Sequence, residues 1–81
     1  MDPQQLAGMI RAGLAGSTAT VVSDDNVHFE AVVVAGAFAG KRALQRHQLV
    51  YATLGAAMGT EIHALALKVY TPEEYAAQSR G

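Results

Sequence analysis

Cysteine is absent from the 81 residues of this chain. The chain therefore has no disulfide to cross-link its fold and no thiolate of its own to act as a nucleophile or a metal ligand, so the fold depends on packing. No uninterrupted apolar run approaches the roughly 20 residues that cross a bilayer, and the N-terminal MDPQQ lacks the basic and apolar segments of a secretory signal. These absences predict a soluble cytoplasmic protein with no membrane partner.

Charge is scarce and nearly balanced. Six basic residues oppose seven acidic ones, which gives a formal net charge of −1. Because nonspecific affinity for nucleic acid comes from many neutralised phosphates, a dominant phosphate-binding surface is not expected. Any such binding would have to come from a local group of basic side chains.

The stretch 35–54, AGAFAGKRALQRHQLVYATL, carries the clearest pattern of the chain and a local excess of positive charge. Gly36 and Gly40 bracket Phe38, which predicts a tight loop that turns one aromatic side chain inward. Beyond the loop, side chains recur at steps of three and four, which predicts the buried face of a helix. These side chains are Leu44, His47, Tyr51, Leu54 and Met58. Three residues fall mostly off that face and form a predicted basic rim: Lys41, Arg42 and Arg46.

The segments before this stretch predict a helix and a hairpin. Asp2 followed by Pro3 is typical of a helix start, and Gly16 is a plausible end. Two runs of strand-forming residues follow, at 18–23 and about 28–35. Because only a short polar turn separates them, they are expected to pair as an antiparallel hairpin.

The segments after the stretch predict a third strand and a closing helix. Alternation over 62–70 places His63 on one face with Leu65, Leu67 and Val69, and places Ile62 on the other face. A cap, a proline and two acidic residues at 71–74 then predict a helix from Pro72 to about Gln78. A strand, a helix and a neighbouring strand form a right-handed crossover, so the third strand should run parallel to the second.

These elements together predict a single α+β domain over residues 1–81. Their order is α-β-β-α-β-α, with helices on a three-stranded mixed sheet. The order and the connectivity resemble the type II KH layout.

Two segments, HFEAVVVAGAFAGKRALQRHQLVY and IHALALKVYTPEEY, resemble the BolA family. The resemblance extends from about Leu6 to Tyr75, and its motifs occur in order along the chain. They comprise Phe38, Gly40, Arg46, His47, Val50 and Tyr51, then Ile62, His63 and Ala64, then Thr71, Pro72 and Glu74. The short turn in the hairpin resembles the bacterial branch with the shorter loop.

The resemblance implies a BolA fold, a KH-like α+β domain, and two activities. One is association with a monothiol glutaredoxin, in which a [2Fe-2S] cluster is held by the glutaredoxin cysteine, glutathione and BolA residues. The other is nucleic-acid binding in transcriptional regulation and stress response. The resemblance also implies that His63 is a cluster ligand and that a second ligand comes from the loop between the first two strands.

The sequence departs from the family at this second ligand. The turn from Ser23 to Val27 contains neither histidine nor cysteine, and the nearest candidate is His28. The expected parallel crossover puts the starts of the second and third strands at the same end of the sheet. We therefore expect His28 and His63 to lie near one another, as shared ligation would need.

Other interpretations of these residues stay open. Isolated histidines are more often hydrogen-bonded structural residues than ligands, which is the alternative for His63 and the leading interpretation of His28. For His47 we expect a packing role on the helix. The spacing of the three histidines does not indicate an autonomous zinc site.

The basic rim also has two interpretations. It is either a solvated helix face or a surface that binds phosphate or the anionic groups of a partner. KH domains clamp single strands at a Gly-x-x-Gly loop, whereas three residues separate Gly36 from Gly40 here. The candidate contacts are Gly40, Lys41, Arg42 and Arg46.

No enzymatic site is predicted. Asp24 and Asp25 are adjacent in a turn, which suits turn formation better than acid-base catalysis. The sequence with its resemblance thus predicts an adaptor, monomeric or weakly homodimeric, that shares a cluster through His63. The alternative is a KH-like nucleic-acid-binding regulator.

Overall fold

The computed structural model describes residues 1–80, so Gly81, the last residue of the predicted domain, lies outside the described part of the chain. The elements are α1 (Pro3–Gly13), β1 (Thr18–Val22), β2 (His28–Val34), α2 (Ala43–Leu54), β3 (Ala64–Tyr70) and α3 (Pro72–Arg80). Two short 3-10 turns, η1 (Gly36–Phe38) and η2 (Gly55–Ala57), flank α2. The predicted order α-β-β-α-β-α is confirmed.

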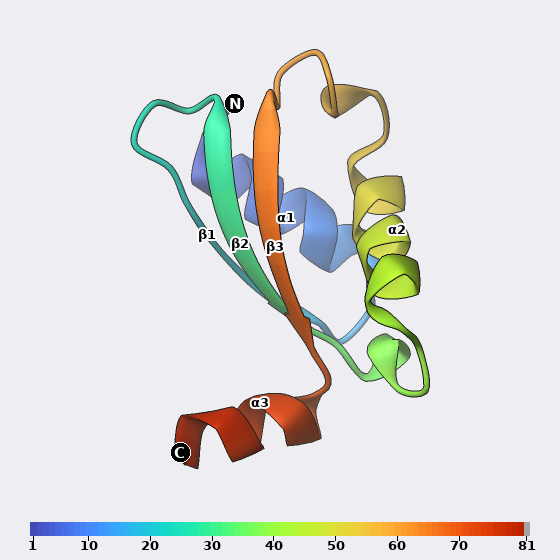
Figure 1. Ribbon diagram of the computed structural model, residues 1–81. Coiled ribbons are helices and arrows are strands. Elements are labelled where there is room, and N and C mark those ends of the chain that lie inside the picture. The colour runs from blue at the N-terminus through green and yellow to red at the C-terminus, as the bar shows by residue number, and fades with distance from the viewer. Residues whose placement is uncertain (81) are drawn as a thin grey trace.

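The three strands form one mixed sheet in the order β1-β2-β3 (Figure 1). β1 pairs with β2 in antiparallel register, and β2 pairs with β3 in parallel register, so His28 lies opposite Ala64. Helices α1 and α2 cover one face of the sheet, while α3 lies beyond the end of β3 (Figure 1). Within residues 1–80 no helix crosses the other face, which is therefore open (Figure 1).

The core lies between the sheet and the two covering helices. β2 alternates strictly at its start, and Phe29, Ala31 and Val33 face the helices and are buried. The largest fully buried side chains come from five separate segments: Phe38, Leu6, Ile10, Ile62, Val33 and Val50. The inward orientation predicted for Phe38 is confirmed, since none of its surface is exposed. Gly40 ends this turn with φ of 74°, a left-handed conformation that favours glycine.

The predicted buried face of α2 is confirmed at Leu54 but wrong at Leu44 and Tyr51. Leu44 is 69% exposed and Tyr51 is 38% exposed, whereas Val50 and Leu54 are buried. Apolar residues occur on more than one side of this helix, so spacing alone did not identify the side that meets both α1 and β3. Met58 lies outside the helix, because the chain leaves α2 at Gly55.

The predicted alternation at the start of the third strand is also wrong. β3 begins at Ala64, and Ile62 and His63 belong to the turn before it. Ile62 is fully buried and His63 is exposed. The predicted alternation had instead placed His63 on the same face as Leu65, which packs against the core. Because His63 lies in this turn and not in the strand, its side chain is exposed and accessible to a partner.

Arg46 links α2 to the start of α3. Its guanidinium forms two bonds with the carboxylate of Glu74, at 2.6 and 3.1 Å, and its Nε donates to the carbonyl of Lys41 at 2.9 Å. The same guanidinium lies 5.9 Å from the centre of the Phe38 ring. Glu74 also accepts from the amide of Thr71, whose hydroxyl caps the amide of Glu74 in return. This network fixes the loop, α2 and α3 to one another.

A matched pair of leucine substitutions tests the position of the buried face of α2. Leu54→Ala should lower the free energy of unfolding by about 2–5 kcal/mol, because it leaves a cavity between the helix and the sheet. Leu44→Ala should change it by no more than about 0.5 kcal/mol, because that side chain is in solvent. Urea unfolding measures both values, and similar losses for the two variants would contradict this helix orientation.

The Arg46–Glu74 pair predicts a dependence of stability on pH. The hydrogen bond from Arg46 and that from the Thr71 amide lower the pKa of Glu74 from 4.5 to about 2. Because folding lowers this pKa, the ionised carboxylate stabilises the fold above the unfolded value, and this contribution is lost as pH falls towards 2. Glu74→Gln should therefore be less stable than the wild type at neutral pH, and the difference should shrink across that interval.

Urea midpoints measured at a series of pH values would follow this difference. Glu73→Gln makes the same charge change one residue earlier in α3 and serves as the control. A difference between Glu74→Gln and the wild type that stays constant from neutral pH down to pH ~2 would count against the ion pair as its source.

Candidate functional site

The two candidate ligands lie at one end of the sheet. The carbonyl of Val27 accepts hydrogen bonds from the amides of His63 and Ala64, at 3.0 and 3.4 Å, and the parallel register then continues with His28 opposite Ala64. His63 therefore belongs to the turn immediately beside the residue that precedes His28. Both histidines are exposed. The predicted placement of the starts of β2 and β3 at the same end is confirmed.

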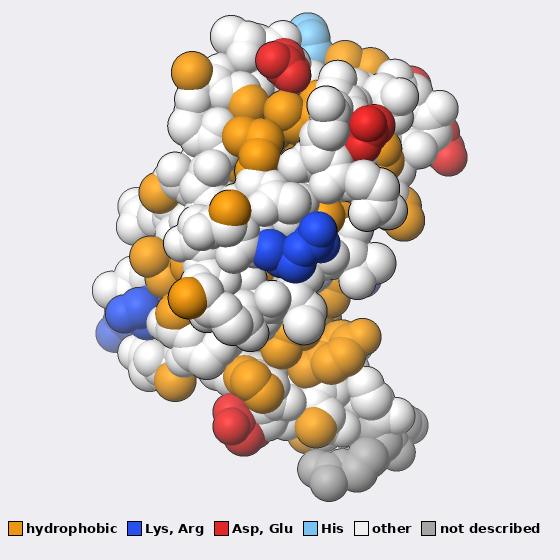
Figure 2. All heavy atoms as spheres, turned by 180° about the vertical axis from the view of Figure 1, so that it is seen from behind, with side chains coloured by type: hydrophobic (Ala, Val, Ile, Leu, Met, Phe, Trp, Pro, Cys, Tyr) orange, Lys and Arg blue, Asp and Glu red, His pale blue; other side chains and the backbone are white. Residues whose placement is uncertain are grey.

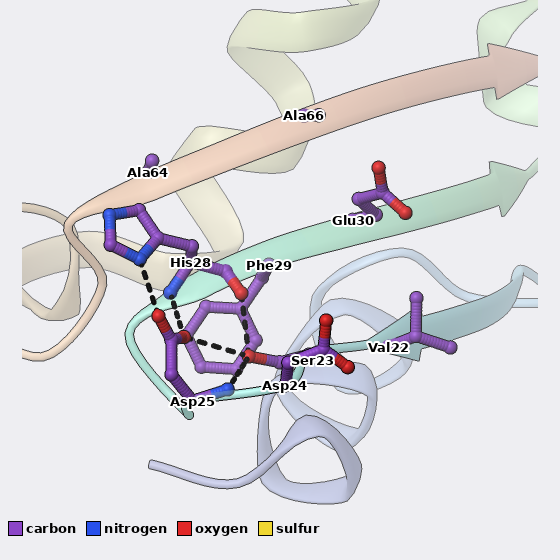
Figure 3. Close-up of a pocket in the computed structure, with 9 residues that line it drawn as sticks. All are labelled: Val22, Ser23, Asp24, Asp25, His28, Phe29, Glu30, Ala64 and Ala66. Atoms are coloured by element: carbon purple, nitrogen blue, oxygen red, sulfur yellow. Dashed lines mark hydrogen bonds and ion pairs between the residues drawn. The ribbon is translucent and has the colours of Figure 1, made fainter.

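The ring of His28 is held by a carboxylate. Its Nδ1 lies 2.7 Å from Oδ2 of Asp25, while Oδ1 of Asp25 accepts from the amides of Val27 and His28 at 3.0 and 2.9 Å (Figure 3). The amide of His28, its ring and the amide of Val27 together hold the pKa of the Asp25 carboxyl well below its usual range. Asp25 is thus ionised at neutral pH and can only accept hydrogen bonds.

Sequence reasoning missed this contact because it assigned Asp25 to turn formation alone. Asp25 does form the turn, through its Oδ1, but its second oxygen is free to reach a side chain. The Asp-x-x-His spacing at the entry to a strand was the signal that could have indicated it. Ser23 completes the turn by donating from its hydroxyl to the carbonyl of His28.

A shallow hollow of about 450 Å³ adjoins this pair on the open face of the sheet. Carboxylates of Asp24, Asp25 and Glu30 line it together with the ring of His28, and its floor includes Ala66 (Figure 3). The small alanines of β3 leave the ring uncovered on that side (Figure 3). The hollow therefore presents imidazole nitrogen and carboxylate oxygen atoms at the surface of the protein.

The end of the sheet that carries His28 and His63, here called the histidine end, suits a metal group whose remaining ligands come from a partner. Within the described residues, no group of three or more histidine, cysteine or acidic side chains could hold a metal ion. His28 and His63 do supply two accessible imidazoles at one end of the sheet. Imidazoles are established ligands of [2Fe-2S] iron in sites where thiolates supply the remaining bonds. The donors present are therefore compatible with a shared cluster.

His47 lies apart from this site. It is half-buried on α2, and its ring meets that of Tyr51 edge-on, with centroids 6.3 Å apart. This contact agrees with the packing role expected for His47.

The basic rim is at the opposite end of the sheet. Gly40, Lys41 and Arg42 follow the end of β2 and precede α2, and all three are exposed. β2 contains seven residues, so about 20 Å of strand separates this rim from His28. In Figure 1 the chain enters β2 and β3 at the top and leaves them at the bottom, beside α3. A group bound at the histidines would therefore not contact the rim.

Arg46 differs from the other two basic residues of the rim. Its side chain is only 13% exposed, because it is engaged by Glu74 and lies over Phe38. Lys41 and Arg42 therefore remain as the accessible cations of the rim. On the face seen in Figure 2, the Lys and Arg side chains form separate groups and no continuous patch.

Within residues 1–80, no helix has both the length and the apolar character needed to cross a membrane.

Comparison with curated proteins identifies relatives over the central part of the chain. The chain is 46% identical over 48 residues to the "DNA-binding transcriptional regulator BolA" of Escherichia coli, a match that covers 59% of this chain and 46% of that protein. It is 46% identical over 52 residues to the regulator of the same name from Haemophilus influenzae, covering 64% and 50%. The matched region thus spans about half the length of these relatives.

Solved structures match nearly the whole chain. A bolA protein homologue from Coxiella burnetii superposes with a TM-score of 0.80 at 46% identity, covering 94% of this chain and 97% of the homologue. A bol-like protein from Babesia bovis gives the same TM-score of 0.80 at 30% identity, covering 99% and 95%. The family model for BolA-like protein matches residues 11–74. With this match over most of its length, and with the fold of its solved homologues, the chain belongs to the BolA family.

Proposed function

We propose that this chain is an adaptor that binds a monothiol glutaredoxin and shares a [2Fe-2S] cluster with it through His63. The observation that carries the proposal is the parallel pairing of β2 with β3, which brings His63 and His28 to one end of the sheet. The turn before β3 supports it by leaving His63 exposed while the preceding Ile62 anchors the backbone in the core.

In this proposal the chain contributes nitrogen ligands and the partner contributes sulfur ligands. The chain has no cysteine, so the thiolates would come from the glutaredoxin and from glutathione. The amide of His63 is bonded to the carbonyl of Val27, which fixes the backbone from which the ring extends. His63 would be the principal ligand and His28 the second. A chain with this role needs no catalytic group of its own.

A second candidate function is nucleic-acid binding. It is favoured by the names of the bacterial relatives, which are DNA-binding transcriptional regulators, and by the exposure of Lys41 and Arg42 at the start of α2. With Arg46 held by Glu74, Lys41 and Arg42 are the two accessible cations of the rim. Because each neutralised phosphate adds to affinity and to its salt dependence, a surface of this size predicts weak binding.

Mixing experiments under anaerobic conditions test the adaptor proposal. Adding this protein to a cluster-loaded monothiol glutaredoxin should change the visible absorption and circular dichroism, because an imidazole joins the iron coordination. His63→Ala should lose this change, and Glu61→Ala, an exposed neighbour in the same turn, should retain it. The proposal fails if His63→Ala and the wild type give the same spectra.

Salt titrations test the alternative. If the rim binds DNA, the double substitution Lys41→Gln and Arg42→Gln should lower the slope of log affinity against log salt by about 2. Lys68→Gln, which removes an exposed cation of β3, is the control and should leave the slope unchanged. An unchanged slope in the double variant would exclude the rim as the contact surface.

A further inference from the structure

The contact between Asp25 and His28 determines which ring nitrogen of His28 carries the proton. A neutral imidazole has one N–H donor and one lone-pair acceptor, and the hydrogen bond at one nitrogen selects the role of the other. Oδ2 of Asp25 lies 2.7 Å from Nδ1, and an exposed aspartate is ordinarily a carboxylate at neutral pH, which only accepts hydrogen bonds. In the neutral ring, Nδ1 must then be the donor, and Nε2 keeps its lone pair.

The other ring nitrogen of His28, Nε2, also has a defined direction. Figure 3 shows the ring of His28 above the sheet beside Ala64, with its second nitrogen turned away from Asp25 and towards the start of β3. His63 is the residue that precedes Ala64. The lone pair of Nε2 therefore faces the end of the sheet at which the chain passes from His63 into β3.

Asp25 is itself rigidly held. Its Oδ1 accepts from the amides of Val27 and His28, and its Oδ1 is also 3.3 Å from the hydroxyl of Ser23. These bonds leave Oδ2 as the oxygen available to the ring. A carboxylate that accepts the N–H of a histidine and fixes its tautomer is the usual arrangement behind histidine ligands of metals.

We propose that Asp25 is a positioning residue that fixes His28 in the Nδ1–H tautomer and thereby presents Nε2 as the second nitrogen ligand beside His63. The ligand part of this proposal rests on the proposed adaptor function. The positioning part concerns the free protein alone, so it can be tested without a partner or a cluster.

Asp25→Asn is the decisive variant because it reverses one hydrogen bond and retains the others. The amide oxygen of asparagine can replace Oδ1 and accept from Val27 and His28, which preserves the turn. Its NH₂ group would replace Oδ2 and donate to Nδ1, which must then carry the lone pair. The proton moves to Nε2 in this variant, and the nitrogen facing β3 loses its ability to bind a metal.

Asp24→Asn is the matched control. It makes the same charge change one residue earlier in the same hollow, while the hydrogen bond to His28 comes from Asp25. A backbone amide spectrum of each variant establishes that the turn is preserved.

The first readout is the tautomer of His28 in the free protein, measured by long-range ¹H–¹⁵N correlation at alkaline pH, where imidazoles are neutral. The wild type and Asp24→Asn should show a protonated Nδ1 and an unprotonated Nε2, and Asp25→Asn should show the reverse. Mixed tautomers in the wild type, or the same tautomer in Asp25→Asn, would overturn the positioning role whatever the cluster experiments show.

The second readout is the spectrum obtained with cluster-loaded monothiol glutaredoxin. Asp25→Asn should give the spectrum of His28→Ala, because both lack a lone pair at Nε2 of residue 28, while Asp24→Asn should give that of the wild type. A wild-type spectrum from Asp25→Asn with a reversed tautomer would overturn the ligand part. Failure of the adaptor function is distinguished by His63→Ala, which would then also match the wild type.

Discussion

Parallel pairing between β2 and β3 is the constraint on which the placement of both candidate surfaces depends. Because the two strands run in the same direction, the residues immediately before them lie at one end of the sheet and the residues immediately after them lie at the other. Val27 bonds to the turn that carries His63 at the first end, and η1 and α3 lie at the second. The crossover helix α2 covers the sheet between them and buries Val50 and Leu54.

The second end is stabilised by a different kind of contact. The exposed helix α3 has few apolar contacts, and its connection to the rest of the fold depends on Arg46, Glu74 and the tilted rings of Tyr70 and Tyr75. Because Arg46 is bonded to the carboxylate of Glu74 and packed over Phe38, its main role is to stabilise the fold. The two ends of the sheet thus differ. At the histidine end both imidazoles are exposed, whereas at the other end one of the three cations of the rim, Arg46, is already paired with Glu74.

Much of this arrangement could be predicted from the sequence, because its signals are local. A cap, a proline and acidic residues at Thr71–Glu74 mark the start of α3, and a polar turn between two apolar runs marks the hairpin. The buried face of α2 was predicted correctly at Leu54 but not elsewhere, since its apolar residues are not confined to one side and tertiary packing buries Val50 while Leu44 and Tyr51 stay exposed. The exposure of His63 was also beyond prediction from alternation, because the strand begins at Ala64, two residues later than the pattern predicted.

The histidine site itself required the three-dimensional structure. The crossover predicted that His28 and His63 would share an end of the sheet, but the role of Asp25 depends on the direction of one carboxylate oxygen. The partner of Arg46 lies 28 residues away in the chain, so no local pattern indicated it.

Pulsed electron paramagnetic resonance of the reduced complex would test the central claim most directly. This protein would be labelled with ¹⁵N-histidine and combined with an unlabelled, cluster-loaded monothiol glutaredoxin. We predict ¹⁵N coupling to the cluster that persists in His47→Ala, weakens in His63→Ala and is lost when His28 and His63 are both replaced by alanine. A spectrum of the wild-type complex without ¹⁵N coupling would contradict ligation of the cluster by this chain.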